Sequence, residues 1–216
     1  MKYYTIILLL IISHKALAQK EKLVFRYDEF LIGMFNDYNG RIKIIGDEKQ
    51  SSLLTSFYCS QENLSKLFLD TLQVSTKDLT KDIKIENGII YSKNASEHLN
   101  VFYIEKADVD NDSIRFLYLD KNKFETKSQK IAFLAGTFLR YGKLENNKVT
   151  LSFANSLSHY DAAVNFIKSL KFKIVNQARN LENTPVGQSI QFIPAKGYEE
   201  VFEYLSSIKP KSNICN

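Results

Sequence analysis

Residues 131–153 read IAFLAGTFLRYGKLENNKVTLSF, and the spacing of the apolar residues changes within this stretch. In the first half apolar residues recur every three or four positions, which predicts a helix that ends near Gly142. In the second half they alternate with polar residues, which predicts a strand with one solvated face. The helical set is Ile131, Leu134, Ala135, Phe138 and Leu139, and the alternating set is Val149, Leu151 and Phe153.

The same two spacings extend to both sides of this stretch. Residues 101–106 and 114–119 are rich in aromatic and β-branched residues and flank a polar turn, which predicts a hairpin. Downstream, a helix over 160–170, strands at 172–174 and 190–193 and a last helix over 197–208 follow. Upstream, helical spacing recurs over 24–38, 51–57 and 64–72. The sequence therefore predicts an α+β fold: a mostly antiparallel sheet of five or six strands with helices on one face, preceded by an N-terminal helical segment.

Residues 1–18 have the pattern of a secretory signal peptide. Lys2 precedes an apolar run over 3–12, and Ala16-Leu17-Ala18 fits a small-residue cleavage site. The alternative is a short buried element at the start of the domain. We expect a signal peptide over 1–18 and one α+β domain over 19–216, with a helical part over 19–80 and a sheet-and-helix part over 81–216. The expected location is secreted or periplasmic, with no transmembrane segment in the mature chain.

The net charge of the chain gives little reason to expect that it binds a polyanion. The formal net charge is +5, and loss of the leader removes two lysines and no acid, which leaves +3. The lysines at 168–173 and 209–211 form only loose clusters, for which a solvated surface is the simpler interpretation. We therefore expect no nucleic-acid partner, and a protein or small-molecule ligand in its place.

Cys59 and Cys215 are the two cysteines of the chain. An even pair in an exported protein favours a disulfide that ties the C-terminal tail to the N-terminal part. Two free thiols are the alternative, with Cys59 buried and Cys215 in a frayed tail.

Asp108, Asp110 and Asp112 alternate within the predicted hairpin turn and are weak candidates for a calcium site, because hard cations prefer clustered oxygen ligands. A calcium-binding loop would have Gly at its sixth position, where this chain has Ser113, and Glu at its twelfth, where it has Leu119. A solvated hairpin tip is the interpretation that fits both departures.

Residues 156–161, read as Ser-Leu-Ser-His-Tyr-Asp, are the most suggestive stretch for catalysis. His159 with Ser156 or Ser158, and Asp161, could serve a small secreted hydrolase if the fold brought base and nucleophile within hydrogen-bond reach. The alternative makes Ser158 a helix N-cap and Asp161 a first-turn residue that favours the positive helix end.

The sequence has no glycine-rich phosphate loop, no dinucleotide fingerprint and no nucleophile elbow, and it shows no family resemblance. We therefore expect no cofactor. The interpretation that follows is an exported, soluble, non-catalytic binding or interaction module, with the small hydrolase as the alternative.

Overall fold

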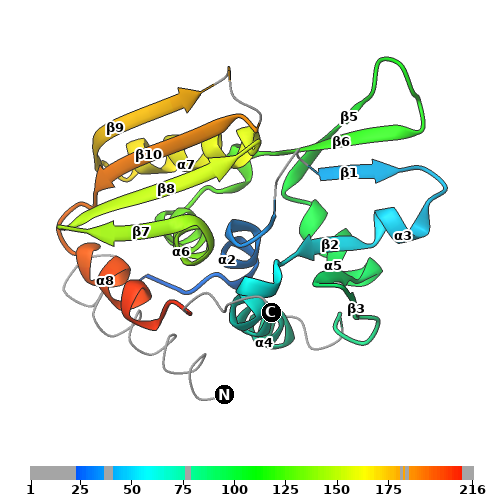
Figure 1. The fold of residues 1–216 in the computed structure, drawn as a ribbon, viewed down its shortest axis with the longest axis horizontal. Helices are drawn as coiled ribbons and strands as arrows, with labels where there is room; N and C mark the ends of the chain where they lie inside the picture. The colour runs from blue at the N-terminus through cyan, green and yellow to red at the C-terminus, as the bar shows by residue number, and fades with distance from the viewer. Residues whose placement is uncertain (1–22, 37–40, 76–78, 181, 183–184, 211–216) are drawn as a thin grey trace.

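The computed structural model describes residues 23–36, 41–75, 79–180, 182 and 185–210. Within these residues seven α-helices pack around three antiparallel sheets (Figure 1). No helix in this part of the chain is long and apolar enough to span a bilayer. The helices are α2 (Tyr27–Gly33), α3 (Glu48–Ser51), α4 (Glu62–Ser75), α5 (Lys93–Asn100), α6 (Lys127–Tyr141), α7 (Leu157–Ser169) and α8 (Glu199–Ile208).

Ten strands form these sheets, and all their pairings are antiparallel. The largest, sheet C, has the order β7-β8-β10-β9, sheet A has β1-β6-β5, and sheet B has β2-β4-β3. The strands are β1 (Arg41–Ile44), β2 (Leu53–Ser56), β3 (Lys84–Glu86), β4 (Ile89–Tyr91), β5 (Tyr103–Ala107), β6 (Ile114–Leu119), β7 (Gly142–Glu145), β8 (Lys148–Ala154), β9 (Lys173–Asn180) and β10 (Gly187–Ile193).

Helix α6 is the central element of the core. A capping box begins it: the backbone N–H of Gln129 donates to Oγ1 of Thr126 at 3.2 Å, and the N–H of Thr126 donates to Oε1 of Gln129 at 2.9 Å. Every residue from Ile131 to Arg140 is buried. A helix that is buried all round must have neighbours on every side, and α6 contacts α2, α7, α8, β7 and β8.

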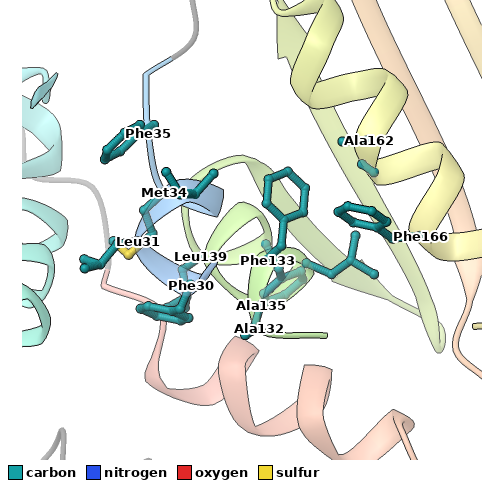
Figure 2. Close-up of a cluster of buried hydrophobic side chains, with 14 of the residues drawn as sticks. Phe30, Leu31, Met34, Phe35, Ala132, Phe133, Ala135, Leu139, Ala162 and Phe166 are labelled. Carbon is teal, nitrogen blue, oxygen red and sulfur yellow. The ribbon is translucent and has the colours of Figure 1, made fainter. Parts of the chain in front are cut away.

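Helices α2 and α6 cross at a pair of glycines. A Cβ on Gly33 would lie 2.1 Å from the carbonyl oxygen of Phe133, and a Cβ on Gly136 would lie 2.0 Å from the carbonyl oxygen of Phe30. Each glycine therefore lets the other helix approach to backbone contact. The contact is reciprocal because both helices carry the pattern Phe-Leu-x-Gly-x-Phe, at 30–35 and at 133–138. Figure 2 shows the side chains that pack around this crossing.

Much of the predicted order is confirmed, including the α+β class, the antiparallel pairing and the helix that begins near residue 160. The single sheet of five or six strands is wrong, since the strands divide into three smaller sheets. Residues 51–57, expected to be helical, contain β2, which pairs with β4. The reason is tertiary: Leu54 and Thr55 become buried in a sheet whose other strands lie more than 25 residues away in sequence.

Candidate functional site

The solvated side of sheet C presents polar residues from all four of its strands. In β8, Val149, Leu151 and Phe153 are buried, so the residues between them face the other way. Directly paired residues in an antiparallel sheet share a face, and the register extends this surface across all four strands. We call it the polar face: Lys143, Lys148, Thr150, Ser152, Lys173, Asn176, Asn180, Ser189 and Gln191.

Its charged and neutral groups lie at different places. Lys173 is opposite Ile193 at the end of β10, and Lys148 begins β8 after the β7–β8 turn, so the lysines gather toward one end of the strands. Hydroxyls and amides continue toward the other end, and Nε2 of Gln191 donates to Oγ1 of Thr150 across the strands at 3.1 Å. Glu145, the acidic group on this side, pairs with Lys143 at 2.6 Å.

Helices cover only the opposite side of this sheet. Helix α7 packs on β9 and β10, and α6 packs on β7 and β8, where Phe153, Ile190 and Phe192 are buried. Figure 1 shows α7 behind the sheet, with the strands in front. A sheet covered on one side presents its alternate residues to solvent, so the polar face is open to a ligand.

Sheet A has a different outer surface. Ile104 is 47% exposed and Tyr118 is 44% exposed, and these two residues are paired across β5 and β6. Phe116 lies on the same side, paired with Ile42. Lys106 is the cation of this surface, with its Nζ 4.9 Å from the centre of the Tyr118 ring. The outer surface of sheet A is therefore mainly apolar.

A buried arginine lies at the C-terminal ends of α2 and α6. Nη1 of Arg140 donates to the carbonyl of Met34 at 2.6 Å and to Oγ1 of Thr55 at 3.3 Å, and Nη2 donates to the carbonyl of Ser56. Its guanidinium lies 4.4 Å from the centre of the Phe57 ring. Burial lowers the pKa of Arg140. This cation neutralises the partial negative charge at the end of α2 and joins the helix pair to β2.

The residues proposed for hydrolysis belong to α7 and its N-cap. His159 is fully buried, and its Nε2 lies 3.1 Å from the hydroxyl of Tyr103. The N-cap is Ser156, which is also buried, so the expectation of Ser158 as N-cap is wrong by two residues. Asp161 is exposed and pairs with Arg179 at 3.3 Å. A catalytic role for these residues stays a prediction from the sequence alone.

The aspartates proposed for calcium lie in the loop between β5 and β6, as the hairpin prediction placed them. Oδ1 of Asp108 accepts from the backbone N–H of Asp110 at 2.7 Å and of Asn111 at 3.2 Å, which accounts for the tight turn. Among the described residues no three His, Cys, Asp or Glu side chains gather as a metal site would require. Calcium binding by Asp108, Asp110 and Asp112 also stays a prediction.

Cys59 lies in the short 3-10 helix Cys59–Gln61 and is exposed. The described part of the chain contains no free cysteine thiol. Cys215 falls outside the described residues, as does the leader over 1–18, so no disulfide is found among the residues that the structure describes. The Cys59–Cys215 bridge and the secreted or periplasmic location therefore stay predictions.

Comparison with known proteins finds a likeness of fold. No protein-family model and no curated protein matches the chain. Among solved structures, the chain is similar to a variant of I-DmoI in complex with its target DNA in the presence of 2 mM Mn. The TM-score is 0.50 at 11% sequence identity, over 85% of this chain and 95% of that one. At this identity the likeness concerns the fold alone.

This likeness corrects two expectations from the sequence. The interpretation as an exported, non-catalytic binding or interaction module is wrong, because the solved structure that the fold resembles is that of a protein in complex with its target DNA. The exclusion of a nucleic-acid partner is wrong for the same reason.

Proposed function

We propose that the protein binds double-stranded DNA through the polar face of sheet C. The observation that carries this proposal is the solvated, helix-free side of a four-stranded sheet, rich in hydroxyls and amides and bordered by lysines. The similarity of the fold to a protein solved with its target DNA supports it.

The chemistry of the face suits the two parts of a duplex. Lysines bind phosphates and supply affinity without sequence information. Hydroxyl and amide groups donate to and accept from base edges in the major groove. The face offers both in separate places, since Lys148 and Lys173 lie toward one end and Gln191, Ser189 and Asn180 extend toward the other. A duplex lying along the strands would meet phosphate contacts at one end and base contacts beyond it.

The proposal covers binding. Metal-assisted hydrolysis of a phosphodiester uses carboxylates that hold the ions, and the described residues contain no cluster of three or more metal-ligating side chains.

Fluorescence anisotropy with a labelled duplex tests the proposal. We expect binding whose logarithm falls linearly with the logarithm of salt concentration. Replacing both Lys148 and Lys173 with Ala should weaken binding and reduce that slope by about two, since each phosphate contact contributes about 0.9. Lys84→Ala is the matched control, because Lys84 is an exposed strand lysine of sheet B. No binding at low salt, or an equal loss for the control, would show the proposal to be wrong.

A further inference from the structure

A mainly apolar pocket of about 540 Å³ lies between α4 and the β3–β4 turn. Phe57, Tyr58, Leu69 and Ile85 form much of its wall. Phe57 is buried, whereas Tyr58 is 63% exposed and Ile85 is 54% exposed. Large apolar side chains that stay exposed around one pocket are typical of a ligand-binding groove. The volume is that of a site for a small molecule.

Backbone contacts form the pocket before any ligand binds. Asn87 and Gly88, which make the β3–β4 turn, have φ of 49° and 77°, as a two-residue hairpin turn requires. The backbone N–H of Phe57 donates to the carbonyl of Gly88 at 2.8 Å, and a Cβ on Gly88 would lie 2.3 Å from the carbonyl oxygen of Phe57. The turn is therefore fixed against the chain that leads into α4. A site that is already formed loses little affinity to reorganisation.

The charged side chains at the border of the pocket are paired with each other. Nζ of Lys66 lies 2.6 Å from Oε1 of Glu62, one helical turn away on α4. The hydrogen bond from Lys66 lowers the pKa of Glu62, so the pair is ionised at neutral pH. A charged ligand would have to separate this pair and would leave one of its members without a partner. The ligand that fits is therefore uncharged.

Two hydrogen-bonding side chains also line the pocket. The hydroxyl of Ser65 belongs to α4 and the amide of Asn87 belongs to the β3–β4 turn, and neither has a hydrogen-bond partner among the described residues. A small number of such groups in an apolar wall fixes the orientation of a ligand. The rings of Phe57 and Tyr58 favour an aromatic ligand, since aromatic pairs gain free energy beyond the area that they bury.

We propose that this pocket binds an uncharged molecule with two or three fused aromatic rings and a hydrogen-bonding atom at its edge. The rings pack against Phe57 and Tyr58, and the edge atom bonds to the hydroxyl of Ser65 or the amide of Asn87. The site belongs to α4 and sheet B, so the inference does not depend on DNA binding at sheet C.

Naphthol is the probe, because it has two fused rings, one hydroxyl and no charge near neutral pH. The chain contains no tryptophan, so naphthol fluorescence reports binding, and we expect saturation at one site per chain. Naphthalene sulfonate has the same rings and a negative charge, and it should bind at least about tenfold more weakly because its charge would enter an apolar pocket. An absence of saturable naphthol binding, or equal affinity for the sulfonate, would overturn the proposal.

Substitutions on one helix locate the site. Ser65→Phe should fill the pocket and abolish naphthol binding. Val74→Phe is the matched control, since it adds the same ring at an exposed position of α4 outside the pocket wall, and it should leave binding unchanged. Ile85→Asp changes an exposed wall residue without touching the core and should weaken binding about tenfold. Equal effects of the two Phe variants, or full binding by Ile85→Asp, would place the probe elsewhere and contradict the proposal.

The hydrogen-bonding groups are tested by removing both. Ser65→Ala combined with Asn87→Gly, in which glycine accepts the positive φ of position 87, should weaken naphthol binding about 2–10-fold, which is the effect of one lost hydrogen bond. The same double variant should bind naphthalene as the wild type does, because naphthalene has no hydroxyl. Equal losses for the two probes would show that these side chains shape the pocket and do not bond to the ligand, which would refute the assigned contact.

Discussion

Replacing Gly136 with Ala tests the crossing on which the fold depends. The added Cβ would lie 2.0 Å from the carbonyl oxygen of Phe30, whereas ordinary van der Waals contact begins at 3.4 Å. Helices α2 and α6 would have to separate by about 1.4 Å to relieve the contact. A side-chain rotation cannot relieve this contact, because the oxygen of Phe30 belongs to the backbone of a buried helix and the added Cβ is fixed to the backbone of α6.

The expected cost follows from two opposing effects. Overpacking in a dense core costs about 1–3 kcal/mol and occasionally more, and separating the helices also weakens dispersion contacts along their whole interface. Ala in place of Gly returns about 1 kcal/mol through its higher helix propensity. Because both sides of this contact are backbone, we expect a net loss of about 3 kcal/mol. In a chain of this size that lowers the Tm by about 6–12 °C.

The assay is thermal unfolding followed by circular dichroism, with Gly187→Ala as the control. A Cβ on Gly187 would meet no atom within 4 Å, so that variant should change stability by no more than about 0.5 kcal/mol. Gly33→Ala should match Gly136→Ala, and the double variant should cost less than the sum, because helices that have already separated accommodate the second methyl group. A Tm for Gly136→Ala within 2 °C of the control, a margin below the shift that about 1 kcal/mol produces, would refute the reasoning.

Two further variants test buried cations near the end of α6. Arg140→Met should destabilise the protein by about 3 kcal/mol in urea, because it leaves the carbonyls of Met34 and Ser56 without their charged donor, whereas Lys143→Met on the exposed surface should be nearly neutral. Burial lowers the pKa of Lys209 to about 8 from its ordinary 10.5. As the pH rises, Lys209 therefore loses its proton at a lower pH in the folded state than in the unfolded state. Below pH 8 the ammonium is charged in both states, and its burial lowers the free energy of unfolding by the full amount. The stability of the wild type relative to Lys209→Met should therefore rise as the pH increases from 8 to 10.5, and a difference that falls or stays constant would contradict the assigned environment.

The sequence predicts elements whose periodicity is long and regular, and it misses what depends on distant partners. Helix α7 and strand β8 follow directly from their spacing. The sequence does not show that the solvated sides of β8, β9 and β10 form one surface, because that requires the order of the strands in the sheet. The sequence analysis misses strand β2 for a related reason, since a four-residue stretch with two leucines becomes a strand only when β4 is beside it.

The glycine crossing shows a second limit of sequence reading. A glycine within an apolar helical pattern indicates a weak point or a helix end when it is considered alone. The repeated pattern Phe-Leu-x-Gly-x-Phe was visible at 30–35 and 133–138, and comparing those two segments is the signal that could have paired α2 with α6. A search for repeats of 20–50 residues would not reveal it, because its two occurrences begin at Phe30 and Phe133, 103 positions apart.

The glycine crossing and the outer surfaces of the sheets are under different constraints. Backbone contact at Gly33 and Gly136 admits no larger residue, so this part of the molecule is fixed by sterics. The outward positions of the sheets have no such constraint, and they have taken different residues: Ile104, Phe116 and Tyr118 in sheet A, and hydroxyls, amides and lysines in sheet C. A DNA duplex is bound through charged and hydrogen-bonding groups, and of these two surfaces sheet C presents them. The proposed DNA contact therefore belongs to sheet C, and exchange of the outward residues between sheets A and C, with the crossing left intact, should move binding to sheet A without changing the fold.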